Sequence, residues 1–288
     1  MSPMSPDWLD RNEYPFDPHF LAVDGGRLHY VDEGSGEPIV FVHGQPTWSF
    51  MYRHLIRGLS PRYRCIAVDL LGFGLSDKPR SWSYAPRAHA ANLGALVEHL
   101  ELDPVNLLVH DWGGPIGLGW ASGHRERVRR IIALDTWMWS MAEHGAGRWF
   151  SRIMGSAPGR LATRRLNLFV GVFMKAALGT HWPRVAASYR GPLGRADQRE
   201  GCALFPKMLC DPWLEEIWER RGALADVPAR LIWGGADPAF PAPMRERLAS
   251  VFDRSEVTVH EGVGHFIAEE LGERLTPQVE EFLRAGPG

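Results

Sequence analysis

The stretch VNLLVHDWGGPIGLGWAS, residues 105–122, decides the fold. It begins with a continuous apolar run, Val105–Val109, of the kind that forms a strand buried on both faces of a parallel sheet. The small residues of Gly113–Ser122 allow a helix to begin directly after a sharp turn. Asp111 lies in that turn, so a carboxylate is expected at the carboxyl end of a central strand. This strand–turn–helix unit predicts a nucleophile at position 111.

Short apolar runs alternate with amphipathic stretches on both sides of this unit, which predicts a mostly parallel, doubly wound sheet covered by helices, an α/β fold. Apolar residues recur at helical spacing in Phe50–Leu59, in Ala88–Leu102 and from Leu271 to Phe282. The predicted strands are Arg27–Asp32, Pro38–His43, Arg64–Asp69, Val105–His110, Val128–Leu134, Ala229–Trp233 and Glu256–His260.

The alternation stops between residues 136 and 221, where the sequence predicts several helices joined by Gly/Pro turns and rich in tryptophan. We interpret this segment as a helical cap over the carboxyl ends of the strands. The predicted domains are a core of residues 1–135 and 222–288, and a cap of residues 136–221. Residues 136–214 hold 11 Lys/Arg against 4 Asp/Glu. We expect this excess to lie on a solvated outer face rather than on a membrane or partner surface.

Composition narrows the functional classes. The 288 residues carry a formal net charge of −2, so overall charge gives no reason to expect nucleic acid as a partner. No apolar run approaches the roughly 20 residues of a transmembrane helix, and the N-terminus does not resemble a signal peptide. The three cysteines follow no metal-ligand spacing. We therefore expect a cytoplasmic protein without a metal or organic cofactor, and no membrane partner.

The residue type at position 111 determines the reaction class. Serine is usual at such a turn and attacks carbonyl carbon, whereas a carboxylate can displace a leaving group from saturated carbon and form an alkyl ester. The alternative is that Asp111 only caps the following helix. The remaining catalytic groups occur in the chain order that this unit uses, which favours the nucleophile.

Those groups are a histidine, an acid and two backbone donors. His265 lies in a glycine-rich loop before the last predicted helix. Asp237, just after a predicted strand, is the preferred acid, and Asp135 at the end of IIALD is its rival. The backbone N–H groups of Trp112 and Gln45 are expected to form the oxyanion hole, because Pro46 has no N–H to offer.

With these residues assigned, the sequence resembles the haloalkane dehalogenases of the α/β-hydrolase superfamily over nearly all of the chain outside the cap. The most specific carriers are HGQPTWS and HDWGG. The remaining ones are DLLGFGLSDKP, WGGADPAF and GVGHFIAEE, at residues 69–79, 233–240 and 262–270.

The resemblance implies a substrate and a halide site. Small halogenated aliphatic compounds and water would be the substrates, and Asp111 would form the ester that His265 helps water to hydrolyse. Trp112 occupies the place of the family's halide-binding tryptophan. The second halide donor in the family is an asparagine after His-Gly or a cap tryptophan. Here Gln45 stands at the first position, which leaves the second donor open.

Three alternatives remain. An epoxide hydrolase shares the aspartate and histidine but needs cap tyrosines, and Tyr189 is the only tyrosine between Thr136 and Arg221. A β-lactone decarboxylase uses a similar Asp/His/Asp set and is not excluded by these motifs. A catalytically silent binding protein of the same fold should have lost a member of the site, and none is missing.

Overall fold

The computed structural model of the chain describes residues 6–285, which form an eight-stranded sheet in the order β1-β2-β4-β3-β5-β6-β7-β8. The pairs from β4 to β8 are parallel, and β2 is antiparallel to both β1 and β4. The strands are β1 His19–Val23, β2 Gly26–Glu33, β3 Glu37–Val42, β4 Tyr63–Val68, β5 Val105–Asp111, β6 Val128–Thr136, β7 Ala229–Gly234 and β8 Ser255–His260.

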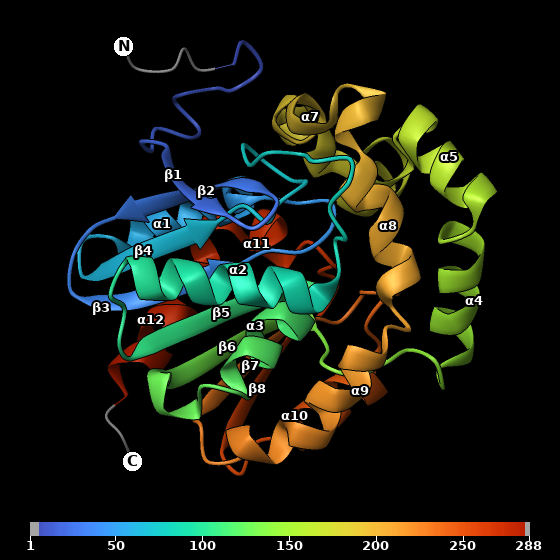
Figure 1. The fold of residues 1–288 in the computed structure, drawn as a ribbon. Helices are drawn as coiled ribbons and strands as arrows, with labels where there is room; N and C mark the ends of the chain where they lie inside the picture. Colours follow the sequence, from blue (N-terminus) through green and yellow to red (C-terminus); the bar gives the residue numbers. More distant parts are fainter. Residues whose placement is uncertain (1–5, 286–288) are drawn as a thin grey trace.

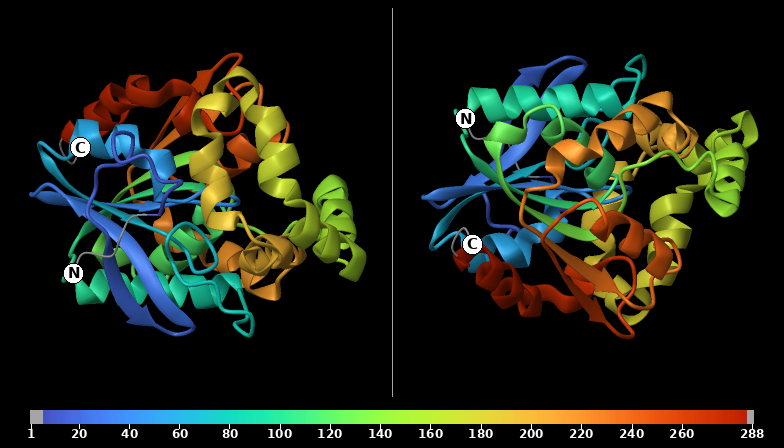
Figure 2. Two further views of the ribbon diagram at one scale, coloured as in Figure 1. Left: turned by 90° about the horizontal axis from the view of Figure 1, so that it is seen from above. Right: turned by 90° about the horizontal axis from the view of Figure 1, so that it is seen from below.

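Helices cover both faces of the sheet, with α1 and α12 on one side and α2 and α3 on the other (Figure 2). This arrangement confirms the predicted doubly wound α/β fold. The core helices are α1 Arg53–Leu59, α2 Pro86–His99, α3 Gly113–Ala121, α10 Ala242–Ala249, α11 Ile267–Leu271 and α12 Thr276–Arg284.

Each of the seven predicted strands is present, with ends within two residues of those predicted. The structure adds β1, which the sequence analysis did not predict. Its residues are exposed or half-buried, because β1 is an edge strand. Its apolar run, Phe20–Val23, is short and not buried, unlike the runs of the inner strands.

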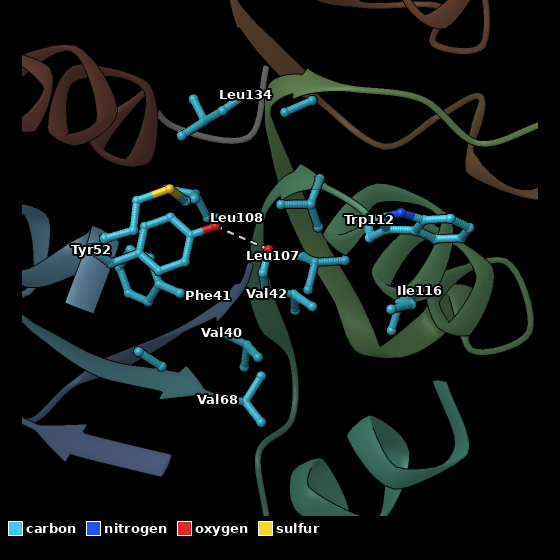
Figure 3. Close-up of a cluster of buried hydrophobic side chains, with 14 of the residues drawn as sticks. Val40, Phe41, Val42, Tyr52, Val68, Leu107, Leu108, Trp112, Ile116 and Leu134 are labelled. Carbon is cyan, nitrogen blue, oxygen red and sulfur yellow. Dashed lines mark hydrogen bonds between the residues drawn. The ribbon is translucent and has the colours of Figure 1, made fainter. Parts of the chain in front are cut away.

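The apolar core lies between the sheet and its helices. Side chains of β3 and β5 meet those of α3 around Leu107 and Ile116, and Tyr52 donates a hydrogen bond to the carbonyl oxygen of Val42 at 3.0 Å (Figure 3). These buried contacts fix β3 and β5 side by side, which places the loops after both strands at the same edge of the sheet.

The segment between β6 and β7 is helical and gathers beyond one end of the sheet (Figure 1). Its helices are α4 Gly145–Met154, α5 Ala157–Leu166, α6 Lys175–Leu178, α7 Trp182–Arg190, α8 Glu200–Met208 and α9 Pro212–Glu219, with a π-helical turn at Phe169–Met174. Trp213 of α9 lies directly over Gly119 of α3, so α9 also packs on the core. The division of the chain into core and cap at residues 136 and 221 stays a prediction.

Among residues 6–285, no helix is long and apolar enough to cross a membrane.

Candidate active site

Asp111 is the last residue of β5 and lies in the left-handed region with φ of 49°, so the turn after the strand is strained. The strain is tolerated because the chain is tightly enclosed there. A Cβ atom added to Gly113 would lie 2.0 Å from the carbonyl oxygen of Val42, so no other residue fits. Asp111 as a whole residue is 8% exposed. The local geometry is that of a nucleophile elbow.

Backbone donors already hold this carboxylate. Oδ1 accepts a hydrogen bond from the N–H of Gln45 at 2.7 Å, and the N–H of Trp112 also bonds the Asp111 carboxylate. Gly44 makes the approach possible, because a Cβ atom there would lie 2.1 Å from Oδ1. Both predicted oxyanion donors therefore reach the Asp111 carboxylate.

The predicted histidine faces the other oxygen of this carboxylate. His265 Nε2 lies 3.8 Å from Asp111 Oδ2, and Nδ1 of the same ring lies 2.8 Å from Oδ2 of Asp237. Asp237, in the loop after β7, is 5% exposed and also accepts the N–H of Ala239. The three side chains thus form a carboxylate–imidazole–carboxylate line, although they come from widely separated parts of the chain.

The pKa values of the two carboxylates are shifted in opposite directions. Burial raises the pKa of Asp111 to about 6, against the opposing charge of His265 and the two backbone N–H groups. Burial also opposes ionisation of Asp237, but the charge and hydrogen bond of His265 keep its pKa below the ordinary value. Burial lowers the pKa of His265, yet Asp237 first and Asp111 second outweigh it and raise that pKa to about 9. At neutral pH the site holds two carboxylates around an imidazolium.

Asp135, the rival acid, ends up in a different environment. It is fully buried near the end of β6, and its Oδ1 accepts the N–H of Gly234 at 2.8 Å. Its Oδ2 has no hydrogen-bond partner, and burial raises its pKa well above the ordinary value. It makes no hydrogen bond to His265. The geometry therefore favours Asp237 as the acid that orients the histidine.

An aromatic wall extends from the elbow to the histidine. Ring centroids of Trp112 and Trp137 are 5.0 Å apart, those of Trp137 and Phe240 are 5.2 Å apart, and those of Phe240 and His265 are 5.4 Å apart. Phe205 of α8 lies against Trp112 from the cap side, with centroids 4.8 Å apart. A water-poor, apolar surrounding of this kind strengthens charge interactions at the carboxylate.

Two indole N–H groups in this wall have no partner within residues 6–285. Trp112 Nε1 donates no hydrogen bond there, and the nitrogen lies on the ring edge turned away from Ile116 (Figure 3). Trp137 Nε1 is buried and equally unpartnered. The side chain of Gln45 is instead engaged elsewhere, because its Nε2 donates to the carbonyl oxygen of Cys202 in α8 at 2.8 Å.

Two supporting residues were missed by the sequence analysis. Nε2 of His110 donates to the backbone carbonyl of His265 at 2.8 Å and so anchors the histidine loop to the elbow. Thr136 Oγ1 donates to the carbonyl oxygen of Asp111. His110 stands inside the HDW motif, which was a signal, whereas Thr136 had none. Among the described residues, no group of three or more His, Cys, Asp or Glu side chains could hold a metal ion.

Comparisons with known proteins place this geometry in context. A family model described as alpha/beta hydrolase fold matches residues 37–270. Haloalkane dehalogenase 2 of Mycobacterium tuberculosis is 39% identical over 279 residues, covering 94% of this chain and 96% of that protein. Cis-3-alkyl-4-alkyloxetan-2-one decarboxylase of Xanthomonas campestris pv. campestris is 31% identical, covering 95% and 98%. Among solved structures, haloalkane dehalogenase DbeA from Bradyrhizobium elkani superposes with a TM-score of 0.82 at 23% identity, covering 93% of this chain and 99% of that one.

Proposed function

The chain belongs to the haloalkane dehalogenase family of the α/β-hydrolase fold, and we propose that it hydrolyses carbon–halogen bonds of small aliphatic compounds to alcohol, halide and a proton. The observation that carries this proposal is the asymmetric placement of the Asp111 carboxylate. Oδ1 accepts the N–H of Gln45, and Oδ2 faces His265. The proposed catalytic residues are Asp111, His265 and Asp237.

In the first step Oδ2 of Asp111 attacks the halogen-bearing carbon, the carbon–halogen bond breaks, and the electron pair leaves with the halide. The indole N–H of Trp112 is the first proposed halide donor, because an N–H donor without an acceptor suits an anion in apolar surroundings. Gln45 was the predicted second donor, but one N–H of its amide is committed to Cys202. Trp137, whose Nε1 is buried and unpartnered, is the better candidate for the second donor.

In the second step His265 takes a proton from water, and the hydroxide attacks Cγ of the Asp111 ester. The developing oxyanion is Oδ1, which the N–H of Gln45 already contacts, and the N–H of Trp112, which also bonds the Asp111 carboxylate, is the second proposed donor. Alkylation neutralises Asp111 and removes one of the charges that raise the pKa of His265. Ester formation therefore lowers the pKa of His265 and makes it easier for the ring to lose its proton and act as a base. Asp237 then supports the imidazolium. Collapse of the oxyanion breaks the Cγ–Oδ2 bond, and the alkoxide takes the imidazolium proton and leaves as the alcohol. The carboxyl group regenerated on Asp111 loses its proton, which is the proton that the reaction releases.

The direct test is bromide release from dibromoethane and bromobutane by three proteins: wild type, Asp111→Ala and His265→Gln. We expect turnover by wild type and no release by Asp111→Ala. His265→Gln should release at most one bromide per active site and retain an alkyl ester on Asp111, detectable by mass spectrometry of the peptide. Absence of halide release from wild type would rule out the proposed reaction.

A β-lactone decarboxylase is the second candidate, because relatives of that name match 93–95% of this chain at 29–31% identity. The same three proteins should be tested with a cis-dialkyl oxetan-2-one and carbon dioxide measured. Decarboxylation by wild type, without halide release from either bromide, would transfer the assignment to lactones.

An epoxide hydrolase is disfavoured by the environment of Tyr189. Its hydroxyl donates to Oε1 of Glu269, and the ring is fully buried. The single tyrosine of the predicted cap is therefore engaged in packing the cap on the core.

A cytoplasmic location is part of this proposal and is supported by three free cysteines, as in a reducing compartment.

A further inference from the structure

The outer surface of the cap segment concentrates exposed apolar side chains. Of the nine large apolar side chains that are exposed among residues 6–285, seven lie between residues 149 and 173. Five of them belong to α4 and the π-helical turn, and we call these five the cap patch. Its members, with their exposed fractions, are Trp149 58%, Phe150 38%, Ile153 61%, Val172 49% and Phe173 42%.

The cap patch is continuous between its two elements. Phe150 of α4 lies 6.3 Å from Phe173 and 6.3 Å from Phe169 of the π-helical turn, measured between ring centroids. Phe169 and Phe173 are themselves 5.3 Å apart. α4 and α5 project away from the sheet in both views of Figure 2, so the surrounding core does not shield this surface. An exposed apolar cluster of this size marks an interaction surface.

Cations predominate in the sequence that forms the cap patch, although Glu200 and Asp197 pair with Arg164 and Arg195. Residues 144–196 contain nine Lys/Arg and no Asp or Glu. Arg148, Arg152 and Lys175, which are exposed next to the patch residues, form no ion pair within the described part of the chain. The guanidinium of Arg152 instead lies 5.8 Å from the ring of Trp149. Surfaces that bind the membrane interface typically combine exposed aromatic side chains with Lys and Arg around them.

We propose that the cap patch docks the enzyme on an anionic lipid bilayer, with the aromatic side chains in the headgroup region and the cations against lipid phosphates. The rest of the chain is net negative, because it holds 23 of the 32 Lys/Arg residues and all 34 Asp/Glu residues. The same bilayer that attracts the cap therefore repels the rest of the molecule, which orients the enzyme with its cap toward the lipid. This proposal does not depend on the reaction that the site performs.

A bilayer fits these observations better than a second copy of the chain. A symmetric dimer through the cap patch would bring the same cations of both copies together without an acidic residue between 144 and 196 to pair with them. The proposal replaces the expectation from sequence that the basic excess is only a solvated face and that no membrane is bound. A docked helix pair requires no membrane-spanning helix.

The test is co-sedimentation of the full chain with vesicles of phosphatidylcholine alone and of phosphatidylcholine with phosphatidylglycerol. We expect binding to the anionic vesicles only. Removing one cation near the surface should weaken binding about fivefold, so Arg148→Gln with Arg152→Gln should weaken it roughly 25-fold. The matched control, Arg220→Gln with Arg274→Gln, removes two exposed arginines outside residues 144–196 and should bind as wild type does.

The apolar half of the proposal has its own pair of variants. Trp149→Ser with Phe173→Ser should lose most vesicle binding, whereas Phe20→Ser with Val257→Ser should not. This control alters the only two exposed large apolar residues outside 149–173 among the described residues. Circular dichroism melting confirms that each variant is folded.

Four results would overturn the proposal. Wild type could fail to bind anionic vesicles, or could bind neutral vesicles equally well. Wild type could also sediment as an oligomer that the Trp149→Ser/Phe173→Ser variant converts to a monomer, which would assign the cap patch to a second copy. If wild type bound an acidic protein through the cap patch but bound no vesicles, the cap patch would be assigned to a protein partner.

Discussion

At the scale of single residues, burial and hydrogen bonding act in opposite directions on Asp111. With a pKa of about 6, Asp111 is half ionised at that pH, so its carboxylate form predominates above pH 6 and is lost as pH falls through it. The rate of ester formation should therefore fall about tenfold per pH unit below pH 6. His265→Gln removes the cation that lowers this pKa, so the acid limb should move to higher pH. Single-turnover bromide release, measured across pH for wild type and His265→Gln, gives the slope of the acid limb and its displacement. A limb that stays in place or moves downward would contradict the electrostatic account.

The two candidate acids give opposite expectations on substitution. Asp237 bonds Nδ1 of His265, so Asp237→Asn should disturb the histidine tautomer and lower kcat by roughly 10⁴-fold. Asp135 accepts a hydrogen bond from Gly234 and makes none to His265, and burial raises its pKa, so Asp135→Asn should change kcat by less than about tenfold. Steady-state halide release by both variants decides the matter. A larger loss in Asp135→Asn would show that the acid has been assigned to the wrong strand.

At the scale of elements, the loop after β3 must approach the elbow closely enough for Gln45 to reach Asp111. A methyl group at Gly44 would overlap Oδ1, Cβ and Cγ of Asp111, at 2.1, 2.4 and 2.6 Å. Gly44→Ala should push the loop away and remove one oxyanion donor, which lowers kcat by about 10²–10³-fold. Gly222→Ala is the matched control, because nothing lies within 4 Å of its added Cβ. Equal activity of the two variants would refute a role for this approach.

Helix α7 is tied to α11 by a buried polar contact. Tyr189 and Arg53 both donate to Oε1 of Glu269, the latter at 2.6 Å. Tyr189→Phe removes one hydrogen bond to a buried carboxylate and should lower the free energy of unfolding by about 1.5–3 kcal/mol. Halide turnover should remain within about twofold of wild type, because the hydroxyl faces Glu269. Urea unfolding and steady-state kinetics measure the two effects. Loss of turnover with unchanged stability would place Tyr189 in the chemistry instead.

The elements could be predicted from the sequence where a local signal existed, and the contacts between them could not. Buried parallel strands are continuous apolar runs, so β5 was identifiable, and chain order selected Asp111 and His265. The side-chain direction of Gln45 had no local signal. Its amide turns to Cys202 because α8 packs over the elbow, 157 residues away along the chain. The unpartnered Nε1 of Trp137 likewise depends on how the cap segment meets the core.

At the scale of the whole molecule, an overall charge near zero conceals a strong separation. The formal net charge of −2 consists of +9 in residues 144–196 and −11 in the rest. If its charge were evenly distributed, a protein with a sequence pI of 6.6 would not bind a cation exchanger above that pH. We expect the opposite at low salt: retention on a sulfonate resin at pH 7.5, lost near 0.15 M salt, where the Debye length is about 8 Å.

This retention reports whether the basic surface is available in solution. Arg148→Gln with Arg152→Gln should elute earlier, whereas Arg220→Gln with Arg274→Gln should elute as wild type, although both variants change the net charge equally. If the two variants elute together, net charge alone governs retention and the separation has no effect at a surface. If only the cap variant is displaced, the cap faces an anionic plane in preference to every other side of the molecule. That orientation is the one that docking on a bilayer requires, and it is measured without any lipid.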